Sequence, residues 1–143
     1  MADLLIADIG GRLVGLPRES VRAIGRIQAL TKIPATGALP LAVAIFNNRL
    51  EAAVDLNAIW KGGELEPDAW QAGIALEAGG WRGVLLAREV GAFASRDELT
   101  GTAETESDPK FDFITGSFQW GGKSGFIIDT EGLLRFIRTH PTK

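Results

Sequence analysis

Few residues of this 143-residue chain have the types and the spacing that catalysis or metal binding requires. The chain contains no Cys. Its single histidine, His140, lies three residues from the C-terminus, where a solvated side chain is more typical than an oriented general base. A transition-metal site would have to consist of carboxylates alone, and no group of them has a ligand spacing typical of such a site. None of the serines lies in a Gly-x-Ser-x-Gly elbow. We expect no catalytic residue, no metal site and no cofactor.

Two aspartates could still form a carboxylate pair for acid–base chemistry, namely Asp55 and Asp129. Each follows a strand-like segment and precedes a helix-like one, so a helix N-cap is the favoured interpretation. Gly122-Lys123-Ser124 resembles part of a phosphate-binding loop, but a β-prone run follows it, which favours a hairpin turn. The tryptophans could stack on a base or a sugar. Because no Lys or Arg cluster accompanies them, packing in the core or between lobes is favoured for Trp60, Trp70, Trp81 and Trp120.

The charge of the chain points to protein partners more than to nucleic acid or membrane. Its net charge of −3 disfavours a general affinity for nucleic acid. Residues 1–63 carry seven Lys or Arg against five Asp or Glu (+2), and residues 64–143 carry eight against thirteen (−5). Such a division could orient a protein partner, or it could reflect two solvated faces. The longest run of aliphatic or aromatic residues, 41–46, is far short of the ~20 needed to span a bilayer, and the N-terminus lacks a basic segment. We expect no membrane insertion and a cytoplasmic location.

Short β-prone segments, separated by Gly or Asn pairs, must position these residues. Residues 4–9 and 12–16 flank Gly10-Gly11 and predict a hairpin. Residues 41–46 predict a buried strand that turns back at Asn47-Asn48, because Asn tolerates positive φ. Two further glycine pairs predict hairpins that join 70–77 to 81–90 and 113–120 to 125–128.

Three segments are expected to differ from this strand pattern. Residues 17–24 predict one or two helical turns in which Val21 and Ile24 share the inward face. Short helices are predicted after Asp55 and after Asp129, so the order hairpin, strand, Asp, helix occurs twice and indicates two similar lobes. Residues 97–110 are polar and acidic, which predicts a mobile loop.

This order of signals resembles the CheW-like domain, the coupling module of bacterial chemosensory systems. The family has a hairpin ending in a Pro turn, then Val-x-Glu-Ile, Thr-x-Leu-Pro, Gly-Val-x-Asn-Leu-Arg-Gly, and a strand ending in Pro-x-x-Asp-Leu. The matching segments here are Gly11-Arg12-Leu13-Val14-Gly15-Leu16-Pro17, Val21-Arg22-Ala23-Ile24, Thr31-Lys32-Ile33-Pro34, the strand 41–46, Ala52-Ala53-Val54-Asp55-Leu56, and, near the end, Phe113-Ile114-Thr115-Gly116 and Phe126-Ile127-Ile128-Asp129.

The resemblance implies an all-β fold with short helices, made of two SH3-like five-stranded β-barrel lobes. It implies one CheW-like domain over residues 1–143, with lobes near 10–65 and 66–143 and with the strand at 3–9 able to join the second lobe. The implied function is that of a non-enzymatic adaptor between the cytoplasmic tip of a chemoreceptor and the regulatory domain of a CheA-type histidine kinase. The implied partner-binding residues are Val21, Arg22, Ala23, Ile24, Arg26, Phe46, Asn47, Asn48 and Arg49.

The departures from the family pattern fall on polar contact residues and spare the residues that hold the fold. Ala23 replaces the family's Glu, and Asn47 replaces the Arg of Asn-Leu-Arg-Gly. We therefore expect weak binding to a generic receptor tip. Two alternatives remain open: a diverged CheW-like module of another signalling complex, and a small β-barrel ligand-binding protein or enzyme.

Overall fold

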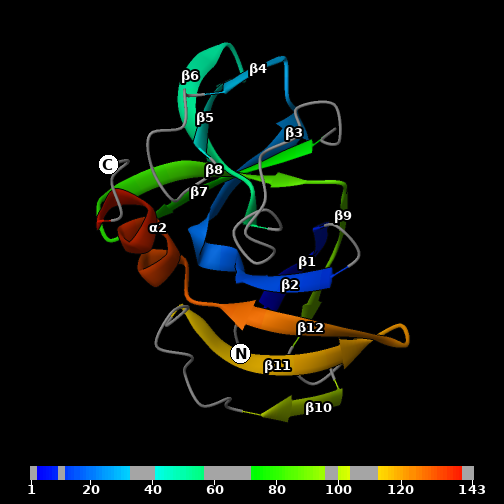
Figure 1. The fold of residues 1–143 in the computed structure, drawn as a ribbon. Helices are drawn as coiled ribbons and strands as arrows, with labels where there is room; N and C mark the ends of the chain where they lie inside the picture. The colour runs from blue at the N-terminus through cyan, green and yellow to red at the C-terminus, as the bar shows by residue number, and fades with distance from the viewer. Residues whose placement is uncertain are drawn as a thin grey trace.

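The computed structural model of the protein describes residues 3–9, 12–32, 41–56, 72–95, 100–103 and 113–139. Within these ranges the chain forms strands, one short 3-10 turn and one α-helix, arranged as two curled sheets (Figure 1). The expected all-β class with short helices is confirmed. Each sheet contains six strands, one more than the five expected for each lobe.

Sheet 1, in the upper half of Figure 1, has the strand order β4-β5-β6-β8-β7-β3. Its two hairpins, β5–β6 and β7–β8, are joined by a parallel pairing of β6 with β8, at Ala53 with Val84 and Val54 with Leu85. The strands span Val21–Arg26 (β3), Ala29–Lys32 (β4), Leu41–Phe46 (β5), Arg49–Val54 (β6), Ala72–Ala78 (β7) and Trp81–Ala87 (β8).

Sheet 2 has the order β10-β11-β12-β2-β1-β9 and repeats this plan. Its hairpins, β11–β12 and β1–β2, are joined by a parallel pairing of β12 with β2, and α2 (Thr130–Thr139) follows β12. The strands span Asp3–Ile9 (β1), Arg12–Pro17 (β2), Glu89–Ser95 (β9), Thr100–Ala103 (β10), Ile114–Trp120 (β11) and Lys123–Ile128 (β12). The first hairpin of the chain, β1–β2, and the last one, β11–β12, thus lie in the same sheet.

The two sheets divide the chain at different places from the expected boundary at residues 65 and 66. Sheet 1 takes its strands from residues 21–87, and sheet 2 takes its strands from residues 3–17 and 89–128. The strand at residues 3–9 lies in sheet 2, between β2 and β9. It is buried on both faces, because alternate residues of β1 pack into two different hydrophobic clusters.

The turn residues adopt the conformations expected from their types. Asn47 and Asn48 have φ of 51° and 62°, in the left-handed region that Asn tolerates better than most residues. The glycine pairs at 79–80 and 121–122 also have positive φ. Asp129 precedes α2, and its carbonyl accepts a hydrogen bond from the Leu133 N–H at 2.9 Å, so it holds the N-cap position. The helix expected over residues 57–60 lies outside the described residues.

The expected helical turns at residues 17–24 are largely wrong. Only Arg18–Ser20 forms a 3-10 turn (η1), and Val21–Arg26 is strand β3, paired antiparallel with β7. Residues three apart in a strand lie on opposite faces. Val21 therefore packs against the core, and Ile24 is 43% exposed. Pairing with β7, distant in the sequence, overrides the local signal of Pro17.

Three other expectations need correction. The segment 81–90 is interrupted at Arg88, because the chain leaves sheet 1 there and enters sheet 2 as β9. The strand 41–46 is buried on one face only, since Val43 and Ile45 are exposed. Part of the expected loop 97–110 is a strand: Thr100–Ala103 pairs with the edge of β11 as β10, and the rest of that segment lies outside the described residues.

Candidate functional site

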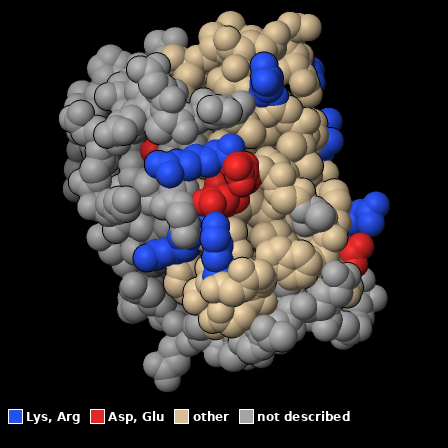
Figure 2. All heavy atoms as spheres, turned by 90° about the vertical axis from the view of Figure 1, so that its right-hand side faces the viewer, with Lys and Arg blue, Asp and Glu red and all other residues tan. Residues whose placement is uncertain are grey.

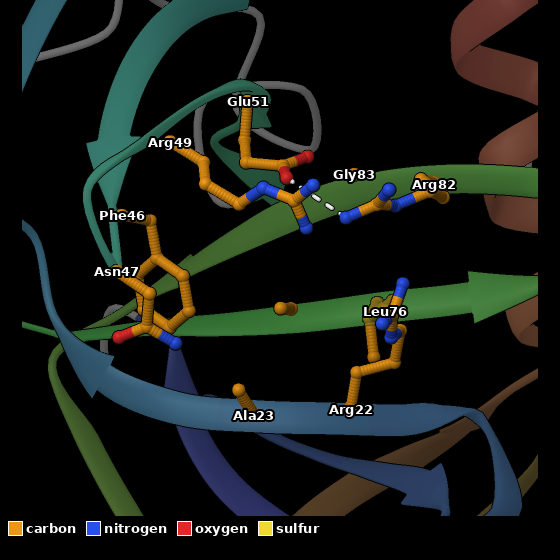
Figure 3. Close-up of a pocket in the computed structure, with 10 residues that line it drawn as sticks. Arg22, Ala23, Phe46, Asn47, Arg49, Glu51, Leu76, Arg82 and Gly83 are labelled. Atoms are coloured by element: carbon orange, nitrogen blue, oxygen red, sulfur yellow. Dashed lines mark hydrogen bonds and ion pairs between the residues drawn. The ribbon is translucent and has the colours of Figure 1, made fainter.

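A small hollow lies in sheet 1, between the β5–β6 hairpin and strands β3, β7 and β8 (Figure 3). Its volume is about 100 Å³, well below the ~300–1,000 Å³ of pockets that enclose a drug-sized ligand. A hollow of this size suits one protruding side chain of a protein partner. The residues that line it are Arg22, Ala23, Phe46, Asn47, Arg49, Glu51, Ala75, Leu76, Arg82 and Gly83.

The hollow combines four charged side chains with an apolar lining in which the ring of Phe46 is the largest group. Phe46 is 2% exposed, and a Cβ at Gly25 would lie 3.5 Å from its ring, so the ring packs over β3. Arg22 forms an ion pair with Glu77 at 2.6 Å, and Arg82 forms one with Glu51 at 3.1 Å. The partners in the Arg22 pair are 45% and 42% exposed. Such exposed pairs contribute little to stability, about 0–1 kcal/mol, so a partner's carboxylate can compete for Arg22 at small cost.

Arg49 is the third arginine of the hollow and differs from the other two. Its guanidinium points toward the Glu51–Arg82 pair in Figure 3, and it has no ion pair of its own with any described residue. Among the described residues, the hollow therefore carries three arginines against Glu51 and the neighbouring Glu77. The surplus of one positive charge favours an acidic group in a bound partner.

The hollow brings together five of the nine partner-binding residues expected from the sequence: Arg22, Ala23, Phe46, Asn47 and Arg49. The other four lie elsewhere. Val21 packs against the core, Ile24 and Arg26 are exposed on β3, and Asn48 is bound by Gln28. The Gln28 amide donates to the Asn48 side-chain oxygen at 3.0 Å and accepts from the Asn48 N–H at 2.8 Å, which fixes the hairpin tip.

Half of the residues that line the hollow were not expected from the sequence: Glu51 lies on β6, and four others lie on β7 and β8, far away along the chain. Arg82 and Gly83 reach the site through the parallel pairing of β6 with β8, and Ala75 and Leu76 reach it through the antiparallel pairing of β3 with β7. A parallel pairing between two hairpins leaves no local signal in the sequence. Of these four residues, only Arg82 is charged, and its place in a β-prone run after the Gly79-Gly80 turn is a local signal of a functional position.

The corresponding hairpin of sheet 2 carries different side chains from those of the β5–β6 hairpin. When the turns 47–48 and 121–122 are matched and the strand registers are followed from them, Ala44 corresponds to Phe118, Glu51 to Gly125 and Arg82 to Leu13. In sheet 2, Phe118 is 1% exposed, and a Cβ at Gly125 would collide with its ring. In sheet 1, the small residue Ala44 is the register equivalent of Phe118, and the ion-paired Glu51 and Arg82 are the equivalents of Gly125 and Leu13.

The described residues were also searched for a metal-binding cluster and for a basic surface that could bind nucleic acid. No group of three or more His, Cys, Asp or Glu that could hold a metal ion occurs among the described residues. Figure 2 shows acidic and basic side chains lying against each other at the centre of one face, in place of a continuous basic tract. Such a mixed surface does not favour nucleic acid.

A family model for the CheW-like domain matches residues 3–138, nearly the whole chain. The chain belongs to the CheW-like domain family. Members of this family are non-enzymatic scaffold proteins. The family assignment agrees with the arrangement of the described strands in two sheets of similar strand order.

Solved structures support the CheW-like fold. The crystal structure of the scaffolding protein TtCheW from Thermoanaerobacter tengcongensis is similar, with a TM-score of 0.65 and 18% sequence identity over 89% of this chain and 88% of that chain. No curated protein matches the sequence. Among the described residues, the CheW-like domain has no helix that is long and apolar enough to cross a membrane.

Proposed function

We propose that this CheW-like protein is a non-enzymatic adaptor that couples a chemoreceptor to a CheA-type histidine kinase in the cytoplasm. The hollow of sheet 1 binds the cytoplasmic tip of the receptor, and another surface binds the regulatory domain of the kinase. The observation that carries this proposal is the convergence of family membership with the hollow. Five residues expected to bind a partner, from β3 and from the β5–β6 hairpin, line one concave site.

The hollow is suited to anchor a protein surface. Phe46 supplies a buried apolar wall, and arginines on β3, β6 and β8 surround it with their charges at the rim. Interfaces commonly place an apolar anchor at the centre and polar groups around it. The β5–β6 tip is fixed before binding by the Gln28–Asn48 contacts, which lowers the entropy lost on association.

The substitutions at Ala23 and Asn47 set the specificity of the site. Each removes a charged group that the family places at this position, and Ala23 and Asn47 both line the hollow. Loss of one charge-assisted hydrogen bond costs about 2–5 kcal/mol when its counterpart stays buried, which corresponds to a weakening of roughly 30- to 4,000-fold. A generic receptor tip therefore binds weakly, and the cognate partner is one that matches the arginines present here. The same observation supports the second candidate, a CheW-like module of another signalling complex.

Titration calorimetry against a receptor-tip fragment tests the proposal. The wild type is compared with the double variant Ala23→Glu/Asn47→Arg, which restores the family's charges. Arg at position 47 must adopt the left-handed conformation, with φ near 51°, at a cost of about 1–2 kcal/mol, so the melting temperature of the variant is measured in parallel. A matched control, Gln119→Ala in sheet 2, is exposed and lies away from the hollow.

A gain of affinity in the double variant, with the control unchanged, supports the site and the adaptor function. Wild-type affinity equal to that of an ordinary CheW would show that the two substitutions do not alter the interface. No binding by either protein, to the generic tip or to a receptor from the same genome, would contradict the coupling function and favour the other signalling complex.

A further inference from the structure

Helix α2 comes after β12 of sheet 2 in the chain, yet it packs against β7 and β8 of sheet 1 (Figure 1). Its residues Leu133 and Leu134 are 0% and 3% exposed and belong to the larger of the two hydrophobic clusters. Within the described part of the chain, α2 contacts three elements that carry the hollow: strand β8, the β7–β8 turn, and the η1 turn that precedes β3.

The contact with β8 is made at Gly83, which lines the hollow and also faces α2. A Cβ at Gly83 would lie 3.1 Å from the Leu134 Cδ2 atom, so the open side of this glycine points to the helix. Arg82 precedes Gly83 and points to the opposite side of the strand, where it pairs with Glu51. At this point only the backbone of Gly83 separates the hollow from α2.

The contact with η1 is a hydrogen bond between two buried hydroxyl groups. Ser20 and Thr130 are 5% and 2% exposed, and their side-chain oxygens lie 2.7 Å apart. Ser20 donates its proton to the Pro17 carbonyl at 2.8 Å, so the Thr130 hydroxyl is the donor to Ser20. Strand β3 begins directly after Ser20, and its residues Arg22 and Ala23 line the hollow. The bond therefore ties the first residue of α2 to one wall of the hollow.

The contact with the β7–β8 turn is made by Glu131. Gly79 has a φ of 58°, and a Cβ there would collide with the Glu131 side chain, so this side chain lies close over the turn. The two strands that the turn joins supply four of the residues that line the hollow. The three contacts of α2 thus fix β3, β7 and β8 relative to one another, although no described residue of α2 lines the hollow itself.

We propose that α2 sets the shape of the hollow, and that Ser20, Thr130 and Gly83 are positioning residues for partner binding. Ser20 and Thr130 are buried, so they act on a partner only through β3. A buried hydroxyl that loses its hydrogen bond costs free energy, so the Ser20–Thr130 pair favours one position of α2 against η1. This inference rests on the adaptor function proposed above, in which the hollow binds the receptor tip.

Changes on the α2 side of the hollow test the inference. Thr130→Val keeps the shape of the side chain but removes the hydroxyl, and Thr130→Ser restores a hydroxyl. Gly83→Ala adds a methyl group toward Leu134, and Ala is compatible with the backbone because Gly83 does not have a positive φ. In the double variant Gly83→Ala/Leu134→Val, the Cδ2 atom that this methyl group would meet is absent.

The control for lost stability is Phe118→Ala, which perturbs the other hydrophobic cluster, in sheet 2. Calorimetry measures the affinity of each full-length protein for a receptor-tip fragment from the same genome, well below the melting temperature. Circular dichroism records whether each variant is folded. Amide exchange of α2 is measured in the wild type with and without the bound fragment.

We expect Thr130→Val and Gly83→Ala to remain folded and to bind the fragment more weakly than the wild type does, by roughly fivefold or more. Thr130→Ser, the double variant and Phe118→Ala should bind within about twofold of the wild type. Because coupling between two sites is reciprocal, the bound fragment should also slow amide exchange in α2, by about threefold or more.

Wild-type affinity in folded Thr130→Val and Gly83→Ala overturns this inference and leaves the adaptor function standing. Equal losses in Phe118→Ala overturn it too, because the cause would then be general destabilisation. Failure of Thr130→Ser and of the double variant to restore binding, or unchanged exchange in α2, likewise contradicts a positioning role. A wild type that does not bind the fragment overturns both this inference and the coupling function.

Discussion

The comparison of the two sheets leads to a prediction about Phe118, a large buried ring in sheet 2 at the register position that Ala44 holds in sheet 1. Phe118 is 1% exposed and packs with five other buried apolar residues: Leu4, Ile6, Leu13, Ala94 and Ile127. Replacing it by Ala removes the ring and leaves a cavity, because strands β1, β2, β11 and β12 cannot collapse around it. Buried Phe→Ala changes typically cost about 3–5 kcal/mol of unfolding free energy.

A loss of this size is a large fraction of the ~5–15 kcal/mol by which domains are stable. At ~2–4 °C per kcal/mol for a chain of this length, Phe118→Ala should lower the melting temperature by about 6–20 °C. Thermal and urea unfolding followed by circular dichroism measure the change. Gly125→Ala perturbs the same contact from the other side, since its Cβ would collide with the ring, and should cost about 1–3 kcal/mol.

Binding at the hollow separates this packing effect from function. Below the melting transition, Phe118→Ala should bind partners of the hollow as the wild type does, since the hollow lies in the other sheet. A stability loss below about 1 kcal/mol would refute the packing reasoning, because a buried ring cannot be removed so cheaply. Loss of partner binding by the folded variant would refute the independence of the two sheets.

Three further predictions concern the hollow and the segments that position it. Arg49→Glu places a carboxylate beside Glu51 and should weaken binding of an acidic partner at the hollow at least tenfold, as measured by calorimetry. Arg49→Lys should keep most of the affinity. Equal affinities of the two variants would show that the charge of residue 49 is not used. Gln28→Ala removes both contacts to Asn48 and should lower the free energy of unfolding in urea by about 1–2 kcal/mol. It should also accelerate amide exchange at the β5–β6 tip, and unchanged exchange would show that the tip is rigid without Gln28. Asp129→Ala should lower the free energy of unfolding by ~1 kcal/mol, because the helix loses its N-cap, and should leave partner binding intact at low temperature. Wild-type stability combined with lost binding would instead show that Asp129 is a contact residue.

Local signals in the sequence predicted most of the hairpins correctly, because turn chemistry is set by a few neighbouring residues. Asn47-Asn48 and the two described glycine pairs occupy the left-handed conformations that their types favour, and the strands on either side follow. The error at residues 17–24 has the opposite origin. Three of those residues do form a helical turn, but the pairing of β3 with the distant β7 decides the conformation of Val21 and Ile24.

Half of the candidate site could be predicted from the sequence, because local signals do not show which distant strands pair. The family pattern drew attention to β3 and to the β5–β6 tip, which are close in sequence to the motifs that carry the resemblance. Arg82 on β8 and Ala75 on β7 reach β3 and the β5–β6 tip only through long-range strand pairing.

The central claim is that this protein holds two partners at the same time, and the most direct measurement is the mass of the mixed complex. Wild-type protein, receptor-tip fragment and kinase regulatory domain are combined at equal concentrations, and the complexes are separated by gel filtration with light scattering. We predict one species that contains all three proteins and that is absent whenever the adaptor is left out. Mutually exclusive binding of the two partners, or no binding of either one, would contradict the account.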